Sequence, residues 1–279
     1  MTRSDLRRHG VRAALLAAAA AGLVVAAVLQ ATSGSPRTSP RPRAASVAAS
    51  FRVAAAGVPE PSRPAFTVRR PVLLNRSAAV SRWAPVLRDV SVRARPDAAS
   101  RSVAELSRLT PEGTTNLVLA IGEVQTNGNI WTHVRLPVLP NNRTGWVPRG
   151  ALGGYNFVHT HLMISLERLT ATLLDDGRAI FRAPIGVGKD AAPTPTGQFY
   201  IREKLTRFRS PFYGPMAFGT SARSNVLTDW PGGGFIGIHG TNEPELIPGR
   251  VSHGCIRLRN QDILTLARLM PVGTPVTIQ

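Results

Sequence analysis

Cysteine is almost absent from this 279-residue chain, since Cys255 is the only one. A single cysteine cannot form a disulfide within the chain, so the fold cannot depend on such a bond. Lysine is nearly as rare: Lys189 and Lys204 are the only two, and arginine supplies the rest of the 34 basic residues. Because acidic residues number only 16, the formal net charge is +18.

Aromatic residues are also few, at 6% of the chain, and the arginines are scattered along it. Nucleic-acid binding favours clustered basic residues with aromatic residues among them, so we do not predict a nucleic-acid partner. A scattered positive charge is typical of a solvated arginine-rich surface, or of attraction to an anionic membrane or wall polymer. Apolar residues make up 43% of the chain, which is enough for a buried core.

The N-terminus has the layout of an export signal. The basic segment Met1–Arg12 precedes an uninterrupted apolar run, Ala13–Leu29. The run is close to the length that spans a bilayer, so residues 1–31 are predicted to be a cleaved signal peptide or a membrane anchor. In both cases the basic flank places the N-terminus in the cytoplasm and the rest of the chain in the cell envelope.

Export makes a lone cysteine unusual. Secreted proteins mostly carry cysteines in disulfide-bonded pairs. An unpaired thiol in that setting is either a small buried hydrophobic residue or a retained reactive group. The residues around Cys255 must decide between the two.

Two segments precede the region of the cysteine. Residues 32–82 are rich in proline, arginine, serine and alanine without a sustained apolar period, which is typical of a disordered tether. Residues 83–153 contain short alternating runs separated by turn signals such as Asn127-Gly-Asn129, which predict a small β-barrel. Strands are expected at Val90–Ala94, Asn116–Ile121, Ile130–Leu136 and Gly145–Pro148.

This barrel region resembles the bacterial SH3-like domain. The resemblance is carried by Val92–Pro96, Trp131–Val134 and Gly145–Val147, which come in the order typical of that domain. It implies an accessory module that binds peptide or cell wall. A purely structural spacer fits the same strands, and Trp131 and Trp146 could line a groove or belong to the core.

Residues 156–279 predict a second unit that is mostly β. Asp176-Gly177 predicts a hairpin turn, and Phe208–Asp229 has no clear period and is predicted to be a long loop or lid. One helix is expected at Gln261–Met270, capped by Asn260. Strands are expected at His159–Ser165, Thr170–Leu174, Ala179–Phe181, Pro184–Lys189, Gln198–Arg202, Phe235–His239 and Val276–Ile278.

Histidine and cysteine come together in two segments of this unit, Gly237-Ile-His239-Gly240 and Ser252-His253-Gly254-Cys255-Ile-Arg257. A thiol reacts as its thiolate and needs a base or a cation nearby. A glycine beside it allows a tight turn that points amides at an oxyanion. These residues predict a Cys/His acyl-transfer site in which either histidine could be the base.

A metal site is the alternative for these side chains, because histidine and cysteine are the usual ligands of zinc. None of their spacings is the helical His-Glu-x-x-His one, and we predict no metal and no other cofactor. The side chains weighed for it are His159, His161, His239, His253 and Cys255.

The same two segments resemble the signature of the L,D-transpeptidase catalytic domain, the YkuD type. Upstream, Ile185-Gly-Val-Gly, Thr194-Pro-Thr-Gly197 and Tyr213-Gly-Pro-Met216 recur in that family's order, so the resemblance covers about residues 158–279. It implies a β-rich sandwich with one or few helices and a capping loop over the groove that holds the cysteine. The chain as a whole is thus expected to be mostly β.

The resemblance also implies roles. Cys255 would attack the carbonyl of the diaminopimelate–D-alanine bond in a peptidoglycan stem peptide, and His239 would be the base, oriented by the Gly240 carbonyl. The amides of Gly254 and Cys255 would form the oxyanion hole, with His253 in support. Substrate contacts are expected from Arg257, Ser252, Tyr213 and Met216.

Three functions remain open from the sequence. The acyl-enzyme could pass to an acceptor amine, which makes a cross-link, or to water, which makes an L,D-carboxypeptidase. The domain could also be catalytically silent, and the chain a wall-binding scaffold. The resemblance implies that carbapenem-type inhibitors bind the enzyme forms.

Overall fold

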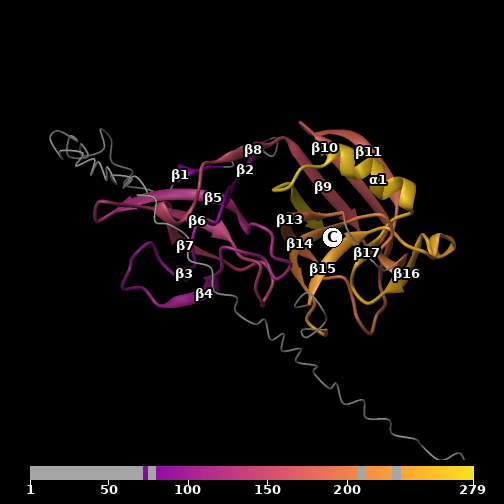
Figure 1. Ribbon diagram of the computed structural model, residues 1–279, viewed down its shortest axis with the longest axis horizontal. Coiled ribbons are helices and arrows are strands. Elements are labelled where there is room, and N and C mark those ends of the chain that lie inside the picture. Colours follow the sequence, from indigo (N-terminus) through magenta and orange to yellow (C-terminus); the bar gives the residue numbers. More distant parts are fainter. Residues whose placement is uncertain (1–71, 75–79, 207–210, 228–233) are drawn as a thin grey trace, which may run out of the picture. The chain divides into compact units, whose positions relative to one another are not determined.

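The computed structural model describes residues 72–74, 80–206, 211–227 and 234–279 (Figure 1). The predicted export signal and nearly all of the predicted tether lie outside the described residues. In the part of the chain that is described, no helix is both long and apolar enough to cross a bilayer.

The first sheet has eight strands, drawn from indigo to magenta in Figure 1. Its hydrogen-bonded order is β4-β3-β7-β6-β5-β2-β8, with β1 pairing β5, and every pairing is antiparallel. The strands are β1 (Val72–Leu73), β2 (Ser81–Pro85), β3 (Val90–Arg93), β4 (Ser102–Leu106), β5 (Leu117–Thr126), β6 (Asn129–Arg135), β7 (Thr144–Pro148) and β8 (Asn156–Val158).

Local sequence accounts for much of this sheet. Asn127 and Gly128 both have positive φ, 48° and 77°, which is the two-residue turn expected between β5 and β6. Strand β1 lies inside the segment predicted to be a disordered tether, and that prediction is wrong for Val72–Leu73. The SH3-like assignment of the sheet stays a prediction.

The two tryptophans of this sheet differ in their surroundings. Trp131 is 5% exposed and therefore buried. Trp146 stacks on His133, with ring centroids 4.5 Å apart. The burial of Trp131 favours a role in the core over a role in lining a ligand groove.

The second sheet has ten strands, in the order β11-β10-β9-β18-β13-β14-β15-β17-β12-β16. Short 3-10 helices interrupt the chain at Arg149–Ala151, Pro211–Tyr213 and Pro244–Leu246. The strands are β9 (Thr160–Ser165), β10 (Thr170–Asp175), β11 (Arg178–Pro184), β12 (Gly186–Gly188), β13 (Gly197–Leu205), β14 (Ala217–Arg223), β15 (Phe235–His239), β16 (Gly249–Ser252), β17 (Ile256–Arg257) and β18 (Pro275–Ile278).

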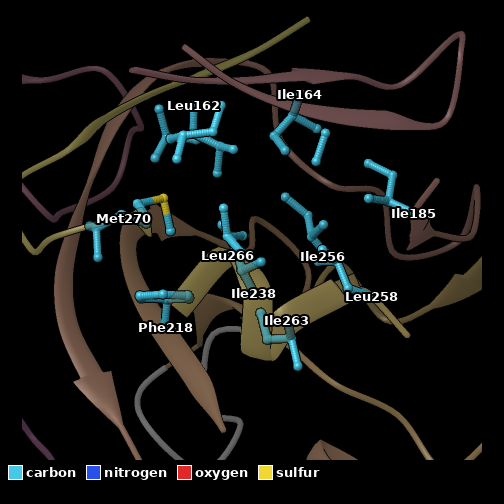
Figure 2. Close-up of a cluster of buried hydrophobic side chains, with 14 of the residues drawn as sticks. Leu162, Ile164, Ile185, Phe218, Ile238, Ile256, Leu258, Ile263, Leu266 and Met270 are labelled. Atoms are coloured by element: carbon cyan, nitrogen blue, oxygen red, sulfur yellow. The ribbon is translucent and has the colours of Figure 1, made fainter. Parts of the chain in front are cut away.

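One α-helix, α1 (Asn260–Leu269), occurs among the described residues. Ile263 and Leu266 are fully buried and Met270 follows on the same face, so the helix packs one apolar stripe against the sheet. Figure 2 shows this stripe meeting side chains from several strands in one core, among them Leu162, Ile164, Phe218, Ile238 and Ile256. This core holds β15 and β17 side by side.

The predicted loop over Phe208–Asp229 is wrong in its centre, because β14 runs through it between β13 and β15. Its sequence, Ala-Phe-Gly-Thr-Ser-Ala-Arg, has no apolar alternation. Most of its residues are buried on both faces of the sheet, including the polar Thr220 and Ser221. A strand buried on both sides need not alternate, so period-2 patterning does not find it.

The first sheet also contacts the second. Tyr200 of β13 is fully buried, donates a hydrogen bond to the Leu117 carbonyl at 3.2 Å, and packs with Leu117 and Leu119. The carboxylate of Glu203 accepts hydrogen bonds from Thr110 and Thr114, at 3.0 and 2.6 Å. These contacts join the two sheets with both an apolar patch and a satisfied buried carboxylate.

Gly273 offers a direct test of this junction. A Cβ at Gly273 would overlap the Trp83 ring of β2, and the residue has φ +81°. We expect Gly273→Ala to lower the free energy of unfolding by about 3–5 kcal/mol, from a steric clash with a rigid ring added to left-handed strain. Gly177→Ala is the matched control, since its φ is +80° and no atom lies within 4 Å. Denaturant unfolding that finds equal losses in both variants would contradict the contact with Trp83.

Candidate active site

The candidate site lies beside two neighbouring parallel strands, β15 and β17. Strands β15 and β17 pair Ile238 with Ile256 and His239 with Arg257, so Gly237 lies across from Cys255. The Gly237 amide donates a hydrogen bond to Cys255 Sγ at 3.4 Å. A Cβ at Gly237 would lie 3.7 Å from His239 Cδ2 and 3.8 Å from Cys255 Sγ, so both side chains flank the same point. Gly237 and Cys255 are 18 residues apart in the sequence, and the pairing of the two strands brings them together.

His239 is held in one tautomer. It is 1% exposed, and its Nδ1 lies 2.6 Å from the carbonyl oxygen of Gly240. A carbonyl only accepts, so Nδ1 carries the proton and Nε2 presents its lone pair. Among the described residues, Nε2 has no hydrogen-bond partner. The predicted contact of His239 with the Gly240 carbonyl is present, and it leaves a base ready to accept a proton.

Burial keeps both reacting groups neutral. It lowers the pKa of His239 to about 4, opposed by the bond to Gly240 and assisted by the positive charge of Arg257. Burial also raises the pKa of the Cys255 thiol, although the Gly237 amide and Arg257 both act to lower it. Desolvation disfavours the charged form of each group, so the resting pair is thiol and neutral imidazole.

Two hydroxyl groups order the loop that carries Cys255. Ser252 is buried; its Oγ donates to the Cys255 carbonyl at 2.6 Å and accepts from the Gly254 amide at 3.1 Å. Thr194 Oγ1 donates to the Gly254 carbonyl at 2.7 Å. Gly254 itself has φ +115°, a conformation that favours glycine.

These bonds bear on two predicted roles. Ser252 lines the pocket, and its hydroxyl already serves as donor and acceptor inside the loop, so its contact with substrate or His253 stays a prediction. The Gly254 amide, predicted to point into an oxyanion hole, is already bonded to Ser252. Sequence alone could not assign these donors, because both bonds depend on the tight turn at Gly254.

Arg257 is a nearly buried cation. Its NH1 pairs with the Glu243 carboxylate at 2.8 Å, and its guanidinium lies 4.3 Å from the centre of the Phe212 ring. The side chain of Arg257 is 5% exposed, whereas that of Glu243 is 42% exposed. Sequence reasoning missed Glu243 and Phe212, since nothing in the local pattern ties either residue to the motif.

A pocket opens beside these groups. Its lining includes Cys255, His239, Ser252, His253 and Arg257, and the Tyr213 ring meets His239 edge-on with centroids 4.9 Å apart. Their roles stay predictions. His253 is exposed at the mouth of the pocket. A mainly apolar lining with a few polar groups is typical of a ligand-binding site.

Met216 is not among the residues that line this pocket, which does not support its predicted substrate contact. Its side chain is 3% exposed and belongs to the hydrophobic core of the second sheet. Met216 directly precedes β14, and only its carbonyl faces the site segment, where it accepts from the Gly240 amide at 3.4 Å.

Asn260 was predicted to cap α1, and this prediction is also wrong. The cap position falls on Arg259, which makes no side-chain cap bond. Asn260 Oδ1 instead accepts from the Thr241 amide at 2.9 Å. A Cβ at Gly240 would collide with this same oxygen, so Gly240 is needed for close approach beside His239.

Two of the histidines weighed as zinc ligands are engaged elsewhere. His159 pairs with Asp176 at 2.8 Å, in the turn between β10 and β11. His161 bonds the Thr277 hydroxyl at 2.8 Å. His161 lies in β9 and His159 directly precedes that strand, and neither lines the pocket.

Comparison with known proteins places the site within a family pattern. Residues 159–278 match the family model of the L,D-transpeptidase catalytic domain, YkuD. The chain is 42% identical over 118 residues to the putative L,D-transpeptidase YkuD of Bacillus subtilis, which covers 42% of this chain and 65% of that protein. It is 57% identical over 44 residues to the probable L,D-transpeptidase YbiS of Escherichia coli, 16% of this chain and 14% of that protein.

Among solved structures, the catalytic domain of the E. faecium L,D-transpeptidase is 26% identical. The alignment covers 43% of the present chain and 96% of the E. faecium domain, with a TM-score of 0.33. The match to the Bacillus protein spans 65% of that protein, which is less than two thirds of its length. The residues that match the family model are those of the second sheet and helix α1.

Proposed function

We propose that this chain, whose residues 159–278 form an L,D-transpeptidase catalytic domain, is a peptidoglycan L,D-transpeptidase that works through an acyl-enzyme on Cys255. The observation that carries the proposal is that the thiol and a base held in one tautomer line the same pocket. His239 ends β15, and Cys255 directly precedes β17, the parallel neighbour of β15. Nucleophile, base and a third group that orients the base are the parts that acyl transfer needs.

Acylation follows from this geometry. The Cys255 thiol proton passes to His239 Nε2 as Sγ attacks the carbonyl carbon of the diaminopimelate–D-alanine bond, which produces an oxyanion. Collapse re-forms the carbonyl and breaks the C–N bond, and the imidazolium returns its proton to the amine of departing D-alanine. The product is a thioester, and the Gly240 carbonyl keeps the imidazole ring in place through both transfers.

The neutral resting pair sets the timing of proton transfer. Because burial disfavours both thiolate and imidazolium, the proton moves with the attack instead of before it. The acceptor step is the mirror image: an amine attacks the thioester, His239 takes its proton, the C–S bond breaks and the proton returns to Sγ. Water in place of the amine gives carboxypeptidase activity.

Arg257 supplies a cation for a carboxylate of the stem peptide, since a guanidinium binds carboxylates strongly. In the free protein that cation is occupied by Glu243, whose exposed side chain is the more easily moved partner. Tyr213, beside His239, and His253, at the mouth, are the other side chains placed to touch substrate.

We expect Glu243→Gln to lower the KM for the donor peptide about 3- to 10-fold with little change in kcat. The neutral amide competes less well for Arg257 than the carboxylate does, so a substrate carboxylate binds there more easily. Glu245→Gln is the control, because Glu245 is exposed in the same short segment. Steady-state kinetics showing a higher KM for Glu243→Gln would mean that Glu243 is needed to hold Arg257.

The remaining proposals concern setting. The substrate lies in the cell envelope, which agrees with export by residues 1–31 as a signal peptide or anchor. The first sheet is proposed to act as an SH3-like module for peptide or wall binding, and carbapenem-type inhibitors to acylate Cys255.

Mass spectrometry of the products separates the possible activities. Purified protein is given a stem tetrapeptide donor with and without an amine acceptor. A cross-linked product and free D-alanine support the transpeptidase, whereas a tripeptide in both reactions supports the carboxypeptidase. A protein that binds peptidoglycan but forms no acyl adduct and no product would be the silent scaffold, and the proposed function would be wrong.

A further inference from the structure

Thr194 is a buried polar residue to which the mechanism above assigns nothing. It lies in the Pro193-Thr-Pro-Thr-Gly turn before β13 and is 5% exposed. Its Oγ1 donates to the Gly254 carbonyl at 2.7 Å and accepts from the Gly188 amide at 2.9 Å. The hydroxyl therefore connects β12, this turn and the loop of Cys255, which lies about sixty positions further along the chain.

The acceptor of that hydrogen bond matters because of the peptide unit it belongs to. The Gly254 carbonyl and the Cys255 amide share one peptide plane, and this bond is trans, since the cis bonds of the described residues precede Pro140 and Pro248. In a trans peptide the C=O and N–H point in opposite directions. Holding the Gly254 carbonyl toward Thr194 therefore directs the Cys255 N–H away from Thr194.

Other amides near the thiol are already occupied. The Gly254 amide donates to Ser252, and the Gly237 amide donates to Cys255 Sγ. Thr194 is not among the residues that line the pocket, whereas Cys255 is. Of the Gly237, Gly254 and Cys255 amides, this leaves the Cys255 amide as the donor to an oxyanion, and its direction depends on the Gly254 carbonyl.

We infer that Thr194 is a positioning residue that aims the Cys255 amide at the oxyanion by anchoring the Gly254 carbonyl. The inference rests on the proposed function and adds to it a residue outside the histidine–cysteine motif. Thr194 touches neither substrate nor the reacting atoms. Its effect is confined to the tetrahedral intermediate and the transition states around it, where the negative charge develops.

The packing around Gly254 agrees with such an anchor. Gly254 has φ +115°, and a Cβ there would lie 3.6 Å from the Pro193 carbonyl oxygen and 3.0 Å from Ile236 Cδ1. The loop is thus pressed against the turn that carries Thr194. A hydroxyl that both donates and accepts in a buried place has one arrangement, so the peptide plane has little freedom to rotate.

The experiment compares Thr194→Val, which keeps the shape but removes the hydroxyl, with Thr194→Ser, which keeps the hydroxyl. Thr196→Val is the matched control, because Thr196 is exposed in the same turn. Donor-peptide kinetics are measured together with the rate at which iodoacetamide alkylates Cys255. Alkylation forms no oxyanion, so it reports on the thiol and base alone.

We expect Thr194→Val to lower kcat about 10- to 100-fold with KM within about twofold, since a misaimed donor weakens only transition-state binding. Alkylation should proceed at the wild-type rate, and Thr194→Ser and Thr196→Val should act like wild type. An unchanged kcat in Thr194→Val would overturn the inference, as would a parallel loss of alkylation. Wild-type protein that makes no product refutes the proposed function instead, and this inference with it.

A second measurement covers the case in which Thr194→Val does not fold. A crystal structure of wild-type protein acylated by a carbapenem should place the acyl carbonyl oxygen within hydrogen-bond distance of the Cys255 amide, with Thr194 still on the Gly254 carbonyl. An acyl oxygen bound by other donors would overturn the inference.

Discussion

Replacing Cys255 with alanine is expected to lower transpeptidation at least about 10⁴-fold and to abolish the covalent adduct with donor peptide. Without the nucleophile no acyl-enzyme can form, so the covalent route is lost entirely. Losses of this kind are typically among the largest seen for a single residue. Mass spectrometry of intact protein after mixing with donor detects the adduct, and product assays give the rate. Cys255 is the only cysteine, so no second thiol can substitute.

The fold should survive this substitution. The side chain is mostly buried but small, and Sγ accepts one weak bond, from the Gly237 amide. We expect the free energy of unfolding to change by about 1 kcal/mol, as for ordinary single substitutions. Thermal unfolding is the control, and Cys255→Ser, which preserves shape, should be nearly as inactive. Cross-linking retained by folded Cys255→Ala would exclude the proposed mechanism.

His239→Gln is expected to lower the rate of acylation about 10²- to 10⁴-fold, the range of general-base contributions. His253→Ala should cost less than about 10-fold, because His253 is exposed, whereas His239 is buried and its Cδ2 and Cys255 Sγ both lie within 4 Å of the place a Gly237 Cβ would take. Rapid-mixing measurement of acylation by donor or carbapenem compares the two. A larger loss from His253→Ala would reverse the assignment of the base.

The same assignment predicts the pH dependence of the wild-type enzyme. A general base must be unprotonated, and burial lowers the pKa of His239 to about 4. The value of kcat/KM should therefore be flat from about pH 5 to neutrality and fall as pH drops through 4. An acid limb well above pH 4 would contradict the assignment of His239 as the base.

Local sequence predicted the parts of the fold that local chemistry decides. The Asn127-Gly128 and Asp176-Gly177 turns occur as predicted, because left-handed φ values are available there. Helix α1 occurs within one residue of its predicted ends, since its apolar stripe repeats with the helical period. Strand β14 was not predicted, because a strand that is buried on both faces lacks the alternation of apolar and polar residues by which strands are recognised.

The sequence by itself determined which groups are candidates for the chemistry: one thiol, the His239-Gly240 pair and a glycine before the cysteine, at a spacing typical of one family. Only the tertiary structure decided the protonation state of these groups and which other residues support them. Burial makes thiol and imidazole neutral, and Met216 proves to be core while Ser252 and Thr194 order the loop of the nucleophile. These outcomes depend on desolvation and on hydrogen bonds between distant segments, neither of which leaves a trace in local residue patterns.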